Sequence, residues 1–146
     1  MLKSFRELEV WQKAHVVVLD IYRITDSFPE RERFGITAQL RRAGASVPAN
    51  IAEGFARRTT REFLQSLAVA NGSLEETRYF LLLSRDLRYL RAPDYEKVER
   101  QCDSVAQMLA ALSRSLANRS RAVSETRVAG RGSRVATAAN KETKGR

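Results

Sequence analysis

The chain has 146 residues, of which 43% are hydrophobic and 29% charged, and its formal net charge is +9. This length fits one domain, and the charge favours polyanionic partners, with nucleic acid ahead of an anionic membrane because no hydrophobic anchor accompanies it. The single cysteine, Cys102, excludes an internal disulfide, and the longest aliphatic or aromatic run, Tyr79–Leu83, is too short to cross a bilayer, so we expect no membrane segment and a cytoplasmic protein.

The first predicted helix covers about residues 7–26 and is apolar on two faces. One stripe consists of Leu8, Trp11, His15, Val18 and Tyr22, and the other of Val10, Ala14, Val17, Ile21, Ile24 and Phe28. One stripe is enough for the core of a four-helix bundle, so the second predicts contact with a neighbouring subunit. We expect His15 to be packed and hydrogen-bonded rather than to act in chemistry.

The second predicted helix begins near residues 32–34 and continues to about residue 58, with a kink between Gly44 and Pro48. Polar residues recur along one of its faces at helical spacing. This polar stripe consists of Gln39, Arg42, Ser46, Asn50, Glu53 and Arg57, and it is accompanied by a basic cluster of Arg41, Arg42, Arg57, Arg58 and Arg61.

Three interpretations of the polar stripe remain open. Guanidinium groups match the geometry of phosphates, and Asn or Gln can add base or sugar contacts, so the stripe and the cluster can form a nucleic-acid surface. The stripe can equally be a solvated helix face. In the third interpretation, Ser46, Asn50 and Glu53 satisfy backbone groups freed by Pro48, or they contact another helix.

The third predicted helix starts at a cap formed by Thr59 or Thr60 and extends to about residue 90. The fourth opens at Pro93-Asp94, and its apolar residues from Tyr95 to Leu116 recur every three or four positions, which is the period of a bundle seam. The four segments predict an all-α fold, an antiparallel up-down-up-down four-helix bundle, over residues 1–118.

Residues 119–146 form a basic tail with eight Lys or Arg and two Asp or Glu, a net charge of +6. The tail has too little apolar surface to offset the entropy of ordering, so we predict that it is disordered. It is either a flexible nucleic-acid arm or a solubilising extension.

The sequence offers little for catalysis. It has one histidine and one cysteine, and it contains no HExxH, no GxxxxGK[ST] and no GxSxG motif. We therefore predict a protein without catalytic residues, metal site or cofactor. The adjacent Glu75 and Glu76 point about 100° apart on a helix and cannot share a site.

Three sequence blocks carry a family resemblance: QLRRA at 39–43, SVPANIAEG at 46–54 and GSLEE at 72–76. Over about residues 4–116 the chain resembles the bacterial four-helix bundle proteins associated with 23S rRNA intervening sequences. The resemblance implies a left-handed bundle that assembles as a homopentameric ring. Such a ring is similar to the accessory variability proteins of diversity-generating retroelements, which bind nucleic acid and a reverse transcriptase.

Two functional hypotheses follow. The first is a homo-oligomer that binds nucleic acid, either structured RNA such as rRNA or a DNA/RNA hybrid, through Arg41, Arg42, Arg57, Arg58 and Arg61, with RNA favoured over DNA. The second is a protein-interaction scaffold or accessory subunit that recruits another protein, for example a reverse transcriptase.

Overall fold

The computed structural model describes residues 1–142, with side chains through residue 132, and in this part of the chain helices are joined by short loops, without a strand. The four α-helices are α1 (Glu9–Thr25), α2 (Ile36–Phe55), α3 (Thr60–Asp86) and α4 (Ala92–Glu142). Two single-turn 3-10 helices, η1 (Phe5–Glu7) and η2 (Glu30–Glu32), precede α1 and α2. The all-α prediction is confirmed.

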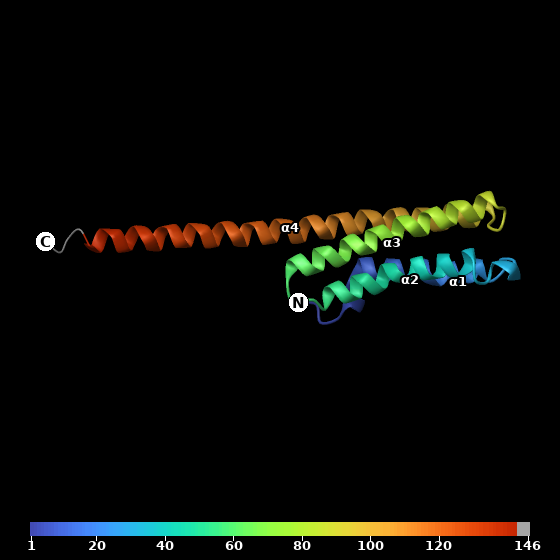
Figure 1. The fold of residues 1–146 in the computed structure, drawn as a ribbon, viewed down its shortest axis with the longest axis horizontal. Helices are drawn as coiled ribbons and strands as arrows, with labels where there is room; N and C mark the ends of the chain where they lie inside the picture. Colours follow the sequence, from blue (N-terminus) through green and yellow to red (C-terminus); the bar gives the residue numbers. More distant parts are fainter. Residues whose placement is uncertain (143–146) are drawn as a thin grey trace.

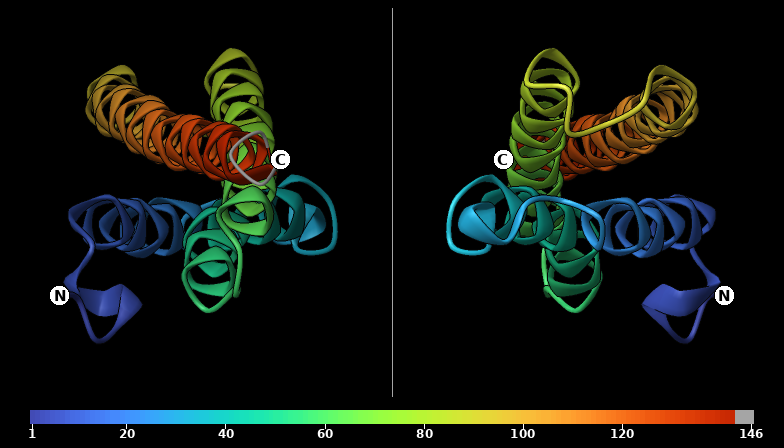
Figure 2. Two further views of the ribbon diagram at one scale, coloured as in Figure 1. Left: turned by 90° about the vertical axis from the view of Figure 1, so that its left-hand side faces the viewer. Right: turned by 90° about the vertical axis from the view of Figure 1, so that its right-hand side faces the viewer.

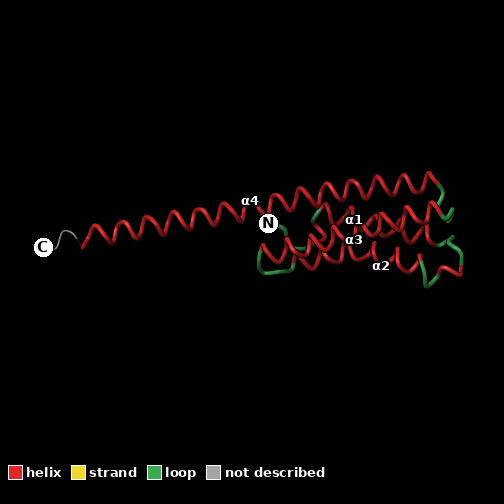
Figure 3. The backbone as a smooth tube through the Cα atoms, turned by 45° about the horizontal axis from the view of Figure 1, so that its top comes forward, coloured by secondary structure: helices red, strands yellow, loops and turns green. Residues whose placement is uncertain are grey.

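The helices form a bundle in which each one packs against two neighbours. The backbones of α1 and α2, α2 and α3, α3 and α4, and α4 and α1 lie close together, whereas those of the diagonal pairs α1–α3 and α2–α4 do not approach closely in the described residues. Successive helices run in opposite directions (Figure 1). Figure 2 shows the four helices end on, and Figure 3 shows the short loops that join them.

The core lies along the shared axis and is made of aliphatic side chains. The second of the two predicted stripes on α1 faces it, with Ile21 fully buried. Leu40 and Ile51 of α2, Leu67 and Leu81 of α3, and Val98, Val105 and Leu109 of α4 complete it. Burial of each such side chain contributes about 1.5–3 kcal/mol, and this is what holds together helices of modest intrinsic stability.

Two local features position α2. A β-carbon on Gly44 would lie 2.7 Å from Cδ1 of Ile21, so the glycine lets α1 and α2 approach closely. At the other end of α2, the Thr59 side chain accepts a hydrogen bond from the backbone N–H of Glu62 at 3.2 Å and caps α3, as the sequence predicts. The turn between these two helices is therefore short and well defined.

The fourth helix does not end with the bundle. The sequence predicts disorder from residue 119, but α4 continues as a helix to Glu142, and we call residues 119–142 the α4 extension. Helix propagation explains the difference, because each added residue gains a backbone hydrogen bond and no proline interrupts the segment. All side chains from 119 to 132 are exposed, so they add nothing to the core. The predicted disorder of residues 143–146 lies outside the described residues.

Candidate nucleic-acid interface

The middle of the polar stripe lies in the seam between α2 and α3. The hydroxyl oxygens of Ser46 and Ser73 are 3.0 Å apart, and Nδ2 of Asn50 donates to the carbonyl and the hydroxyl of Ser46 at 2.8 and 3.0 Å. All three side chains are half-buried. Asn50 does not reach the carbonyl of Gly44, the group that Pro48 leaves without a backbone donor. This part of the stripe forms an interhelical network.

The two ends of the stripe consist of local pairs. Arg42 hydrogen-bonds Gln39 within one turn of α2, and Arg57 forms an ion pair with Glu53. Beside this pair, a groove of about 360 Å³ runs between α2 and α3, and it also contains Glu62. The groove holds two carboxylates, Glu53 and Glu62, against the one guanidinium of Arg57, so its net charge disfavours phosphate and the geometry favours the structural interpretation of the stripe.

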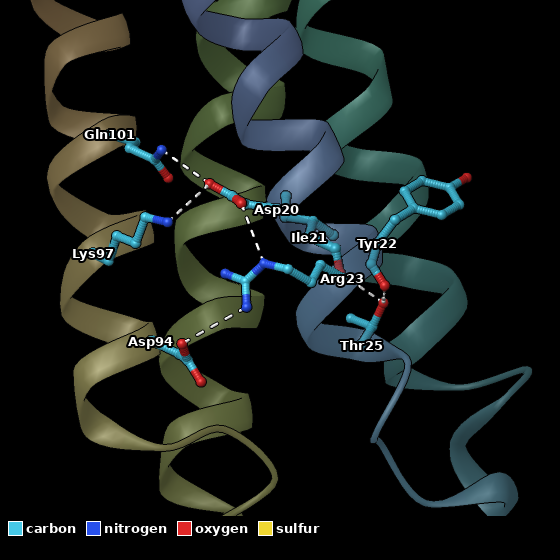
Figure 4. Close-up of polar contacts among 8 residues, drawn as sticks. All are labelled: Asp20, Ile21, Tyr22, Arg23, Thr25, Asp94, Lys97 and Gln101. Carbon is cyan, nitrogen blue, oxygen red and sulfur yellow. Dashed lines mark hydrogen bonds and ion pairs between the residues drawn. The ribbon is translucent and has the colours of Figure 1, made fainter.

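Arg41 links α2 to α1 instead of facing solvent freely. Its Nε donates to Oγ1 of Thr25 at 2.8 Å, and its guanidinium carbon lies 4.5 Å from the centre of the Tyr22 ring. Thr25 is buried and donates in turn to the carbonyl of Ile21 at 2.7 Å, as Figure 4 shows. We therefore assign Arg41 a structural role and remove it from the set of exposed arginines.

The remaining arginines of the cluster gather at the turn between α2 and α3. Arg57 and Arg58 lie in the turn and Arg61 in the first turn of α3, and all three are exposed. Neither Arg58 nor Arg61 forms an ion pair with any described side chain. Arg42 lies about 22 Å away along α2, from the rise per residue. The structure thus divides the predicted cluster, and Arg57, Arg58 and Arg61 form what we call the turn cluster.

Sequence reasoning missed the basic surface that α4 adds to this end of the bundle. Arg119 and Arg127 of the α4 extension line a groove of about 310 Å³ together with Thr60, which begins α3. The prediction of disorder concealed this proximity. The signal in the sequence was the absence of a proline after Pro93, which leaves the fourth helix free to continue past Leu116.

Other charged groups join helices to each other. Asp20 of α1 accepts hydrogen bonds from Gln101 of α4 at 3.0 Å and from Arg23 at 3.4 Å (Figure 4). Between α3 and α4, Arg78 donates to Glu99 at 2.6 and 2.9 Å. Burial lowers the pKa of Arg78, but the hydrogen bond and charge of Glu99 outweigh it, so that the pKa is raised.

The two residues with potential for chemistry are separated and differently placed. Cys102 is fully buried, and burial raises its pKa to about 12. His15 is exposed and stacks on Trp11 with ring centres 5.0 Å apart, so it is packed on one side but makes none of the predicted hydrogen bonds with described residues. Among the described side chains, no group of three or more His, Cys, Asp or Glu residues could hold a metal ion.

The sequence model of one protein family, the 23S rRNA-intervening sequence proteins, matches residues 6–111 of the chain. The match includes α1, α2, α3 and most of the part of α4 that lies in the bundle. The chain belongs to this family. The resemblance found in the sequence is confirmed, and the match ends before the α4 extension. No curated protein matches the chain.

A solved structure shows the same fold. A protein of unknown function from the S23 ribosomal protein family of Bacteroides thetaiotaomicron is 24% identical, with a TM-score of 0.67, and the alignment covers 72% of this chain and 95% of that chain. In the described part of this chain, no helix combines the length and apolarity needed to cross a membrane.

Proposed function

We propose that this protein is a non-enzymatic homo-oligomer that binds nucleic acid through the turn cluster, with structured RNA favoured over DNA. One observation carries the proposal: Arg58 and Arg61, three positions apart in the chain, are both exposed at one end of the bundle without an ion pair among the described side chains. Guanidinium groups left without carboxylates are available to phosphate oxygens, which they bind in a bidentate manner. The association of the family with 23S rRNA supports RNA as the partner.

The exposed apolar side chains support the oligomeric part of the proposal. Leu19 and Tyr22 on α1 are 55% and 49% exposed, and Val69 and Tyr79 on α3 are 51% and 57% exposed. Because α1 and α3 are diagonal in the bundle, these are two separate surfaces. Contact between the α1 surface of one copy and the α3 surface of the next is heterologous and can close into a ring. The pentamer implied by the family resemblance is one such ring.

The same surfaces favour a second candidate function. If they bind another protein rather than a further copy of this chain, the bundle is a scaffold or accessory subunit, and a reverse transcriptase is one proposed partner. In that case the exposed arginines contribute to solubility alone. A partner protein that stays bound after nuclease treatment of a native extract, while the purified chain binds no nucleic acid, would favour the scaffold.

The test of nucleic-acid binding compares two variants of equal charge. Arg58→Gln/Arg61→Gln removes two charges from the turn cluster, and Arg91→Gln/Arg100→Gln removes two exposed arginines elsewhere. Binding to a labelled RNA hairpin and to a DNA hairpin of the same sequence is measured by gel shift at low and moderate salt. We expect the turn variant to bind much more weakly and the control to bind nearly as well as the wild type. Absence of binding by the wild type at low salt would refute the proposal.

A further inference from the structure

The α4 extension passes the turn between α2 and α3 at one end of the bundle. We call the concave surface between the extension and this turn the corner. In Figure 1 the orange part of α4 passes the green turn and the red part continues beyond it. Residues on both sides line the same groove, with Thr60 on α3 and Arg119, Val123 and Arg127 on α4. The corner is therefore built by side chains as well as by the path of the backbone.

The wall that α4 contributes to this corner is basic. Arg127 also lines the next groove along the helix, of about 430 Å³, together with Arg131. No carboxylate lines either groove. At 100° per residue, Arg119, Arg127 and Arg131 lie on the side of α4 that faces the bundle, whereas Arg114, Arg121 and Glu125 lie on the opposite side.

Thr60 lines the α3 side of this groove, and it is flanked in the chain by Arg58 and Arg61 of the turn cluster, which the preceding section assigns to nucleic-acid binding. We propose that this basic corner, with Arg119, Arg127 and Arg131 on one wall and Arg58 and Arg61 on the other, holds the sugar-phosphate backbone of a nucleic-acid strand. This inference rests on the proposed function and extends it to a part of α4 beyond the family match. The shared chemistry is the phosphodiester backbone, and contacts to it position a strand without reading its sequence.

The dimensions of the corner fit a strand. From the rise per residue, Arg119 and Arg127 are about 12 Å apart along α4. Phosphates in one strand of a duplex advance by about 3.4 Å, so the two arginines span roughly three or four successive phosphates. In the proposed arrangement, a strand in the corner meets the guanidinium groups of α4 on one side and those of the turn cluster on the other.

The same residues disfavour an apolar occupant. From residue 119 to 132, Val123 and Val128 are the large hydrophobic side chains, and the next seam position after Leu116 is Arg119. A second copy packing as in a coiled coil would need an apolar residue there. Insertion into an anionic membrane surface would need an apolar face along the helix, which two valines do not supply.

The experiment uses the full-length protein and two variants that each remove two charges from α4. Arg119→Gln/Arg127→Gln changes the corner, and Arg114→Gln/Arg121→Gln changes the opposite side of the same helix. Dissociation constants for the RNA and DNA hairpins are measured over a range of KCl concentrations. Each lost phosphate contact lowers the slope of log K against log salt by about 0.7–0.9, so we expect the corner variant to lose about 1.5 and the control much less.

Each outcome bears on the corner. Equal losses in the corner variant and the control would show an effect of net charge and overturn the corner. If Arg58→Gln/Arg61→Gln weakens binding but the corner variant does not, the corner is overturned and the proposed function stands. No binding by the wild type overturns both. If the corner variant binds the hairpins as well as the wild type does but no longer binds phosphatidylserine vesicles, the arginines of α4 contact a membrane surface instead. Circular dichroism and light scattering confirm equal helix content and subunit number.

Discussion

The close approach of α2 and α3 near their turn predicts different effects on stability for two alanine substitutions. A β-carbon on Gly54 would lie 2.8 Å from Cβ of Ser66 and 3.1 Å from Cδ1 of Phe63, both nearer than ordinary van der Waals contact. A β-carbon on Gly72, on the outer face of α3, would meet nothing within 4 Å. The two glycines occupy helices of the same bundle and differ in this respect, so Gly72→Ala is a matched control for Gly54→Ala.

The magnitudes follow from two opposing effects. Replacing a helical glycine with alanine stabilises by about 1 kcal/mol, and Gly72→Ala should show this gain in full. Forcing a methyl group into a packed interface costs about 1–3 kcal/mol, so Gly54→Ala should be neutral or destabilising by up to about 2 kcal/mol. The expected difference in the free energy of unfolding between the variants is therefore about 1–3 kcal/mol.

The assay is urea unfolding followed by far-ultraviolet circular dichroism, repeated at several protein concentrations because subunit association adds to apparent stability. A double variant, Gly54→Ala/Ser66→Gly, removes the atom that the new methyl group meets. It should recover part of the loss beyond the sum of the single effects. Equal stabilisation by Gly54→Ala and Gly72→Ala would refute the close approach of the helices at Gly54.

Three further predictions concern other contacts. Arg41→Gln should destabilise by about 1–2 kcal/mol in urea unfolding because the bond to Thr25 and the stacking on Tyr22 are lost, whereas Arg42→Gln, which is exposed, should change stability by less than about 0.5 kcal/mol. The pKa of buried Cys102 is about 12, so from about pH 9 the unfolded chain releases the thiol proton while the folded chain keeps it. As the pH rises above about 9, the free energy of unfolding of the wild type should therefore fall more steeply than that of Cys102→Ala, by up to about 1.4 kcal/mol per pH unit. Urea midpoints of both proteins between about pH 8 and 11 measure this difference. Leu19→Glu places a charge on the exposed α1 surface and should lower the molar mass in light scattering, whereas Gln107→Glu, at an exposed position of α4, should not; an unchanged mass for Leu19→Glu would argue against the α1 surface as an interface.

The fold could be predicted because its signals are local or periodic. The apolar positions of α1 fall into two stripes, and the one ending at Phe28 is the buried one. Thr59 was identifiable as a cap from residue type alone. The periodicity could not predict the distance between helices. That distance depends on contacts between residues far apart in the chain, such as those at Gly44 and Gly54.

The candidate site was predicted less well. Sequence spacing placed Arg41 with the other arginines, but its partner Thr25 is sixteen residues away and only the packing of α1 on α2 brings them together. Ser46 and Ser73 are likewise joined across a turn that no pattern spans. For residues 119–142 the prediction of disorder differs from the helix in the structure, because counting apolar residues measures core formation, whereas a helix already nucleated in a bundle can extend without a core.

The position of the corner also affects how tightly an assembly could hold its partner. In a homo-oligomer of the proposed kind, symmetry repeats the corner once per subunit at a fixed spacing. A long polyanion bound at one corner then meets the next at a raised effective concentration, and avidity can exceed the affinity of a single site by about 10²–10⁴. Variants that dissociate the assembly should therefore weaken binding to a long RNA far more than to a short hairpin, although every arginine remains in place.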